Sequence, residues 1–233
     1  SAATTNLAPL GEAATGNGSF GLVADPDNVV RHIPLAHTID GTVYPSLAAE
    51  ALRVAQGAGT YIIKTSTGSG ESYFGGELGV TAMKIGRVVV PTTAEGRVQF
   101  YDTGPVAGRS LSAARVLGGL LDPSLRQQVE GHIVLIGTSA PGLRDIRATP
   151  LDPAAAGVTV QAQALEQMVL GEHLRRPDWA KGAETLALLA VGGVLILVLP
   201  GLGAVWSAAV GAVAVGGGVA ASWFAFTDAQ LLI

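Results

Sequence analysis

The pattern of apolar positions changes abruptly near Glu184. Before this residue, short apolar runs alternate with polar and glycine-rich segments, whereas between it and Asp228 there is no charged residue. The first long run, Thr185 to Leu199, is apolar on every side and stops at Pro200-Gly201, which breaks a helix. The second run is long enough to cross about 30 Å of hydrocarbon at about 1.5 Å per residue. The pattern therefore predicts two transmembrane helices joined by a tight turn, at about 183–199 and 202–226.

The first 182 residues have the mixed pattern of an α/β domain. Ile133 to Ile136 form a continuous apolar run between two glycines, which is typical of a strand buried on both faces of a parallel sheet. The preceding segment, Pro123 to Gly131, has the spacing and end signals of a helix, and Asp122 is placed to cap it. Val158 to Val160 and Gln161 to Gly171 follow as a short strand and a helix. We therefore expect an α/β domain with a mixed sheet flanked by helices.

The N-terminal half adds further strands and helices. Turn-forming residues at Asp25 to Asn28 separate two apolar runs and predict a β-hairpin. Leucines and alanines at helical spacing predict an amphipathic helix that ends at Gly57, and the glycine-rich segment from Lys64 to Gly79 is expected to be a surface loop. The expected strands and helices of this half are strands 20–23, 29–35, 88–90 and 98–101 and helices 45–56 and 112–117.

Composition excludes several classes of function. The formal net charge is -4 and Lys and Arg form no stripe, so we do not expect nucleic-acid binding. The chain has no cysteine, which rules out disulfides, thiolate chemistry and cysteine-ligated zinc. None of the histidines is followed by another at the His-x-x-x-His spacing, so we expect neither a metal site nor a cofactor.

The loop after the predicted central strand is the candidate site, because open α/β sheets usually place their sites at the carboxyl ends of strands. Its backbone N–H groups could bind an anion. Alternatively, its glycines form a tight turn after the strand, and its charged residues hold the loop in place. This structural interpretation is favoured. The residues of this candidate ligand-binding or structural loop are Gly137, Thr138, Ser139, Gly142, Arg144, Asp145 and Arg147.

An enzyme is the alternative function, in which the same loop hydrolyses a substrate. Ser139 or Thr138 would be the nucleophile, a histidine the base and Asp145 the group that orients it. No Gly-x-Ser-x-Gly elbow surrounds Ser139, and no histidine stands at a diagnostic spacing. We therefore expect no catalytic residue in this chain and keep a membrane-anchored hydrolase only as the alternative.

Several segments carry a family resemblance. The longest reads Gly131-His-Ile-Val-Leu-Ile-Gly-Thr-Ser-Ala-Pro-Gly-Leu-Arg-Asp145, and the others are 21–35, 85–91, 101–105, 148–151, 157–158, 163–167 and 174–179. Together they resemble a CHASE type 2 (CHASE2) domain, with the 131–179 part similar to its C-terminal half. The resemblance implies an extracytoplasmic sensory domain of a bacterial receptor, followed by membrane spans and a cytoplasmic output domain, often a nucleotide cyclase or a kinase.

The resemblance also divides the chain. Residues 1–182 are expected to be the sensory domain, incomplete at its N-terminus because no signal peptide precedes Ser1. Residues 183–233 are expected to hold the spans, with a third starting at Leu231. Positive charges at Arg175, Arg176 and Lys181 would place the domain in the cytoplasm, but we follow the family, which places it outside the inner membrane. The expected partners are the lipid bilayer, an unknown small-molecule or environmental signal and a second copy of the chain.

Overall fold

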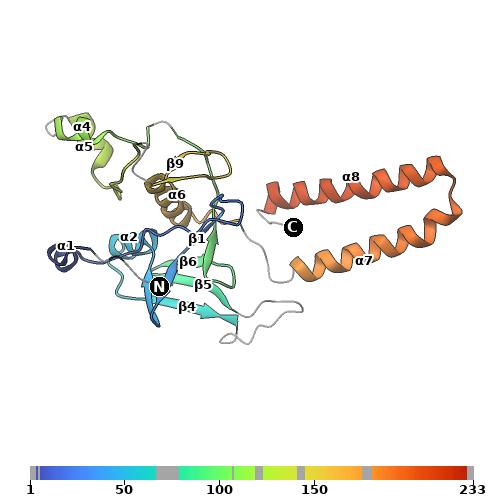
Figure 1. Cartoon of the computed structure of the whole chain (residues 1–233), viewed down its shortest axis with the longest axis horizontal. Helices are drawn as coiled ribbons and strands as arrows, with labels where there is room; N and C mark the ends of the chain where they lie inside the picture. Colours follow the sequence, from blue (N-terminus) through green and yellow to red (C-terminus); the bar gives the residue numbers. More distant parts are fainter. Residues whose placement is uncertain are drawn as a thin grey trace.

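The computed structural model of the chain has two parts, an α/β body and a long helical hairpin that extends away from it (Figure 1). It describes residues 4, 6–66, 79–106, 108–118, 123–140, 145–174 and 180–229. The helices of the body are α1 (Ala8–Ala13), α2 (Leu47–Ala55), α4 (Ala113–Gly118), α5 (Pro123–Val129) and α6 (Gly157–Leu170). The hairpin consists of α7 (Ala180–Val198), the 3-10 turn η1 (Leu199–Gly201) and α8 (Ala204–Ala229).

The described strands of the body form small antiparallel sheets. The largest consists of β4 (Tyr61–Thr65), β5 (Val80–Ile85) and β6 (Val88–Pro91), in that order. The other pairs are β1 (His32–Pro34) with β7 (Arg97–Gln99), β2 (Ala36–Ile39) with β3 (Thr42–Pro45), and β8 (Ile146–Arg147) with β9 (Ala155–Ala156). The α/β class expected from the sequence is confirmed, although the strands form several small sheets.

Helix α2 forms where its local signals predict it. The Ser46 Oγ accepts a hydrogen bond from the Ala49 N–H at 3.3 Å and so caps the N-terminus. The helix buries Ala48 and Leu52 on one face. It ends before Gly57, whose φ of 61° lies in the left-handed region that glycine adopts without a steric penalty. The amphipathic helix predicted at 45–56 is therefore confirmed.

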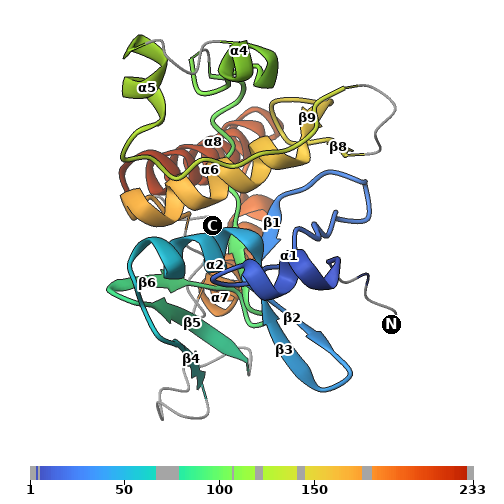
Figure 2. The same ribbon diagram turned by 90° about the vertical axis from the view of Figure 1, so that its left-hand side faces the viewer.

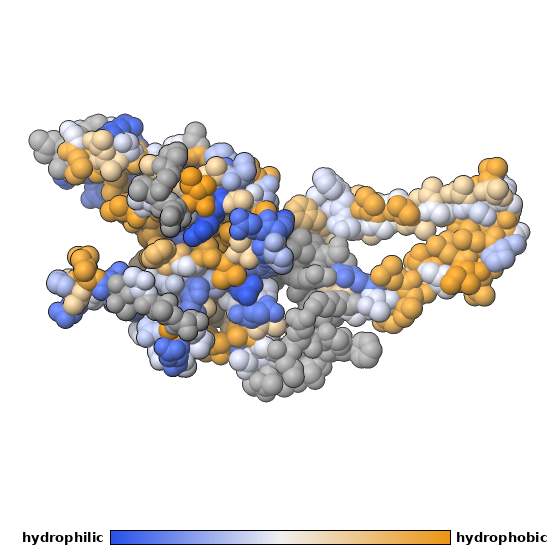
Figure 3. Space-filling model, viewed as in Figure 1, coloured by the Kyte–Doolittle hydropathy of each residue, from blue (hydrophilic) through white to orange (hydrophobic). Residues whose placement is uncertain are grey.

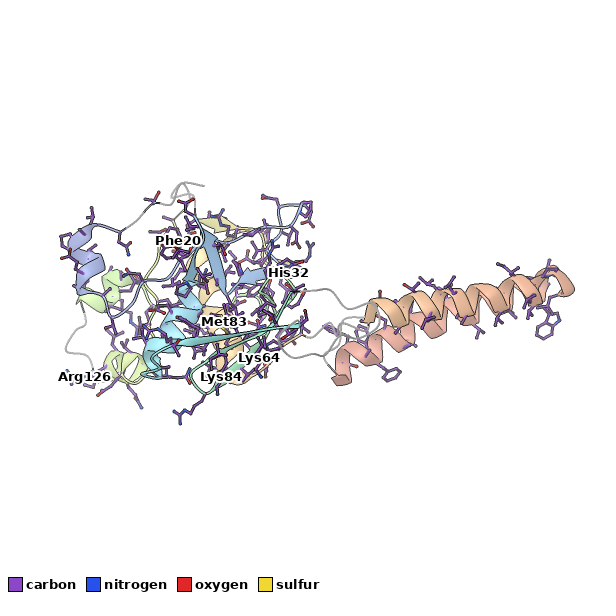
Figure 4. The ribbon with its side chains drawn as sticks, turned by 90° about the horizontal axis from the view of Figure 1, so that it is seen from below. Phe20, His32, Lys64, Met83, Lys84 and Arg126 are labelled. Atoms are coloured by element: carbon purple, nitrogen blue, oxygen red, sulfur yellow. The ribbon has the colours of Figure 1, made fainter. Side chains whose placement is uncertain are left out.

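The hydrophobic core lies between these helices and the sheets. α2 and α6 contact each other, and Figure 2 shows both above the β4–β5–β6 sheet. Side chains along β5 alternate between the two faces of that sheet, so that Met83 is buried within the body while Lys84 lies at its surface (Figure 4). The largest fully buried apolar side chains of the core are Ile33, Leu35, Ile85, Met168, Val30, Val90 and Val160.

The central strand predicted at Ile133 to Ile136 is wrong. This segment has no strand partner among the described residues, and Ile136 is 93% exposed. A β-branched run becomes a strand only where a neighbouring strand completes its backbone hydrogen bonds. The short strand predicted at Val158 to Val160 is also wrong, because these residues form the first turn of α6. Their apolar spacing continues into that helix with Ala164 and Met168.

The hairpin predicted near the N-terminus forms only at its turn. Asn28 has a φ of 66°, as the turn prediction requires, but the following strand β1 pairs with β7 instead of with residues 20–23. The strands predicted at 88–90 and 98–101 are confirmed as β6 and β7, and the helices at 112–117 and 123–131 as α4 and α5. Asp122 and most of the loop expected at 64–79 lie outside the described residues, although Lys64 and Thr65 belong to β4.

The two apolar runs form the helices of the hairpin. Residues Gly182–Gly201 have a mean hydropathy of 2.2 and Ala204–Thr227 one of 1.7, and both segments are long and apolar enough to cross a membrane. Apolar side chains cover most of their visible surface (Figure 3). A core helix of a water-soluble protein would be buried, whereas none of the residues in these two windows is buried. Residues 231–233, where a third span was expected, lie outside the described part.

Candidate functional site

The structure separates the residues of the predicted loop into two groups. Thr138 and Ser139 lie in an exposed segment without regular secondary structure. Gly137, Asp145 and Arg147 lie near the start of α6 and the small β8–β9 sheet. Gly142 and Arg144 fall within residues 141–144, which lie outside the described part of the chain.

The two ends of this loop pack against the first turn of α6. A Cβ added at Gly137 would overlap the side chain of Val158, and one added at Gly157 would overlap the Asp145 carboxylate. The Asp145 carbonyl oxygen accepts a hydrogen bond from the Gly157 N–H at 2.7 Å, next to the β8–β9 pairing. These contacts favour a structural role in which the loop holds the N-terminus of α6 in place. Ligand binding by this loop stays a prediction.

Gly137→Ala tests that structural role. The added methyl group has no free space against Val158, so we expect the free energy of unfolding to fall by about 1–2 kcal/mol. The same substitution at Gly59, where a Cβ would meet nothing within 4 Å, is the matched control. Val158→Gly removes the Cβ that the added methyl group would overlap, so in that background most of the cost of Gly137→Ala should disappear. An equal cost of Gly137→Ala with and without Val158→Gly would contradict the proposed contact.

The geometry gives no support to the hydrolase alternative. His132 Nδ1 lies 3.0 Å from the Glu130 carbonyl oxygen, and His32 Nδ1 lies 3.2 Å from Asp25 Oδ1. Within the ranges that the structure describes, no histidine is hydrogen-bonded to Ser139 or Thr138, and no group of three or more His, Asp or Glu side chains could hold a metal ion.

Three buried glutamines of α6 are the functional candidates that the sequence did not single out. Gln167 Nε2 donates to the Gln99 carbonyl oxygen at 2.7 Å, and its Oε1 accepts from the Tyr101 N–H at 3.0 Å. Gln163 Nε2 donates to the Gly104 carbonyl oxygen at 2.9 Å. Gln161, which is also buried, faces the Phe20 carbonyl oxygen at 3.5 Å. The side-chain amides of Gln163 and Gln167 thus attach α6 to the end of β7 and to the segment that follows it.

A small pocket lies where this segment meets the C-terminal half of α6. Its volume is about 50 Å³. Arg109 reaches across from the segment and forms an ion pair with Glu166 at 2.7 Å, while its Nη1 lies 3.4 Å from the Thr103 hydroxyl. The residues that line the pocket are Tyr101, Thr103, Arg109, Gln163, Glu166, Gln167, Leu170 and Glu172.

The same helix leads directly toward the hairpin. Gly171 closes α6 in the left-handed conformation, with a φ of 72°, and its N–H donates to the Gln167 carbonyl oxygen at 3.0 Å. His173 is buried two residues later, and Ala180 at the start of α7 is fully buried. Only a short segment therefore separates the glutamines of α6 from the first apolar helix.

One signal in the sequence could have identified these glutamines. Gln163 and Gln167 are four residues apart, so they share a face of the helix. Val160, Ala164 and Met168 are also buried on the inner side of α6. Polar side chains that recur at helical spacing within an apolar face must find hydrogen-bond partners in the core, which makes them candidates for a specific role.

A second charged cluster lies at the turn before β1. Arg31 forms ion pairs with Asp25 at 3.1 Å and with Asp27 at 2.7 Å. Partial burial acts to raise the pKa of Asp25, but hydrogen bonds from Arg31 and His32 outweigh it and hold that pKa below its usual value. The cluster is local to its own turn, so we assign it a structural role.

Comparison with known families fits this architecture. The sequence model of the family described as the CHASE2 domain matches residues 1–199, a range that includes the α/β body and α7. No curated protein and no solved structure matches the chain. Because the family match covers well over half of the sequence, the chain belongs to the CHASE2 domain family.

Proposed function

We propose that this chain is the signal-sensing region of a bacterial receptor in the inner membrane, and that it relays its signal to a cytoplasmic output domain, a nucleotide cyclase or a kinase. CHASE2 is a family of extracellular sensory domains. Two exposed apolar helices follow the body, as a membrane receptor requires. We assign the sensory role to residues 1–182 and the transmembrane role to 183–233.

The observation that carries the proposal is the position of α6. Gln163 and Gln167 are bonded to the end of β7 and to the segment after it, and nine residues separate the C-terminus of α6 from α7. A shift of α6 against this segment would displace the start of the first membrane helix. Signalling by this route needs two arrangements of α6 that differ in affinity for the signal.

Cysteine labelling tests the orientation that this proposal requires. The chain has no native cysteine, so a single introduced thiol reports one position without background. Ser139→Cys places a thiol on the exposed surface of the body, and Gly201→Cys places one in the turn between α7 and α8. In intact spheroplasts, a membrane-impermeant maleimide should label Ser139→Cys fully. It should label Gly201→Cys only after the membrane is permeabilised.

The reverse pattern would contradict the proposal. Labelling of Gly201→Cys alone in intact spheroplasts would place the body in the cytoplasm, as the positive charges around residue 176 predict. Labelling of both positions would mean that the two helices do not cross the membrane. The homodimer expected from the sequence stays a prediction, and crosslinking of the Gly201→Cys variant in membranes would test it.

A further inference from the structure

The pocket between residues 101–109 and α6 has a buried inner wall and an exposed mouth. Gln163 and Gln167 are only 8% and 4% exposed, whereas Leu170 on the same helix is 61% exposed. A volume of about 50 Å³ is room for about three or four water molecules, or for a ligand of a few non-hydrogen atoms. The pocket is therefore suited to a very small molecule.

The inner wall lacks one hydrogen-bond donor. Both polar atoms of the Gln167 side chain are paired with backbone groups, and Gln163 Nε2 is paired with the Gly104 carbonyl. Gln163 Oε1, by contrast, is buried and has no partner in the described part of the chain. A buried acceptor without a partner is costly, so a ligand that donates a hydrogen bond to this oxygen would bind favourably. Because the oxygen has almost no accessible surface, the Gln163 side chain must shift toward the pocket for the ligand to reach it.

The charges of the lining have an acidic excess. Arg109 is paired with Glu166, which leaves Glu172 as a carboxylate that no described residue pairs with. A cation in the pocket would therefore be attracted to the Glu172 carboxylate. The ring of Tyr101 is also part of the lining, and aromatic rings attract cations.

We propose that this pocket binds a small primary-amine cation, which donates hydrogen bonds to Gln163 Oε1 and is balanced by the charge of Glu172. The ammonium group supplies the missing donor and the missing positive charge together. Such a ligand contacts α6 and the segment 101–109 at once, so its binding would fix one arrangement of the two. The assignment of this ligand class as the receptor's signal rests on the function proposed above.

The test is a titration of the full chain in lipid nanodiscs with methylammonium chloride. The readout is the NMR signal of the side-chain amides of Gln163 and Gln167. We expect saturable shifts of both. Tetramethylammonium has the same charge but no N–H donor, and sodium chloride at the same ionic strength controls for screening, so neither should produce the shifts.

A matched pair of variants locates the site. Glu172→Gln keeps the shape of the side chain and removes its charge, and it should weaken methylammonium binding about ten-fold. Glu130→Gln, an exposed position at the end of α5, should leave binding unchanged. The proposal is overturned if wild-type chain shows no saturable shift, if tetramethylammonium binds equally well, or if Glu172→Gln binds as tightly as wild type. These results do not depend on the labelling pattern that tests the receptor orientation.

Discussion

Met168→Ala is expected to lower the free energy of unfolding of the α/β body by about 3 kcal/mol. Met168 is 1% exposed and belongs to the core cluster, where α6 contacts α2 and β6. Truncating it removes apolar contacts and leaves a cavity that close-packed neighbours fill only in part. Hydrogen exchange of the backbone amides of β5 and α6, measured on the full chain in nanodiscs, gives this free energy directly.

The next residue provides the control. Val169 is 56% exposed on the same helix, so Val169→Ala should change the free energy of unfolding by no more than about 0.5 kcal/mol. If the two variants have similar effects, α6 does not pack on the core in the way described above. Loss of that packing would also remove the physical basis for relaying a signal through this helix.

The elements that could be predicted from the sequence are those with local signals at both ends. Ser46 and Gly57 mark the ends of α2, and Pro123 and Gly131 mark those of α5. The two apolar helices were equally clear, because an uncharged apolar run of about twenty residues is typical of a membrane-spanning helix. In each case the residues that determine the element lie within it or next to it.

The sheets were harder to predict because their pairings are not local. β1 pairs with β7, far along the chain, and nothing in either short strand specifies the other. The β2–β3 hairpin did have a local signal, the Asp40-Gly41 pair, which is typical of a tight hairpin turn. Both residues have the positive φ that such a turn requires, 49° and 78°. That hairpin was missed because its strands are only weakly apolar.

The contacts of the candidate site were hard to predict for the same reason, because they join distant parts of the chain. The loop predicted at Gly137 to Asp145 was recognised from its glycines and charges, but the two ends of the loop contact the start of α6. The pairing of Gln167 with the backbone around Tyr101 joins two distant parts of the chain, and sequence spacing gives only the face of the helix that carries the glutamine. The partner of a buried polar group becomes visible only in the fold.

A buried ion pair on α2 provides the other large expected effect. Arg53 donates to both carboxylate oxygens of Glu50, at 2.9 and 2.7 Å, and the Tyr61 hydroxyl from β4 also donates to this carboxylate. Arg53 further donates to the Ala58 carbonyl oxygen at 2.7 Å. The cluster thus connects α2 to the edge of the β4–β5–β6 sheet.

These hydrogen bonds make the stability of the folded chain depend on pH through Glu50. Bonding from Arg53 lowers the pKa of Glu50 below its ordinary value of 4.5, although burial opposes the shift, and the Tyr61 hydroxyl adds to the lowering. The folded state therefore binds the Glu50 proton more weakly than the unfolded state does. Its contribution to stability is complete above the ordinary pKa and is lost as the pH falls through the lowered one.

Glu50→Gln should lower the free energy of unfolding by about 2 kcal/mol at neutral pH. This lies below the usual cost of breaking a buried pair, because water reaches part of the Arg53 side chain and screens it. Between about pH 5 and pH 3, the free energy of unfolding of the variant should also fall less than that of the wild type. Both effects are measured by urea unfolding of the full chain across this pH range, with Glu12→Gln on α1 as the exposed control. A Glu50→Gln variant that keeps the wild-type pH dependence would show that Glu50 is not held ionised by Arg53 in the folded chain.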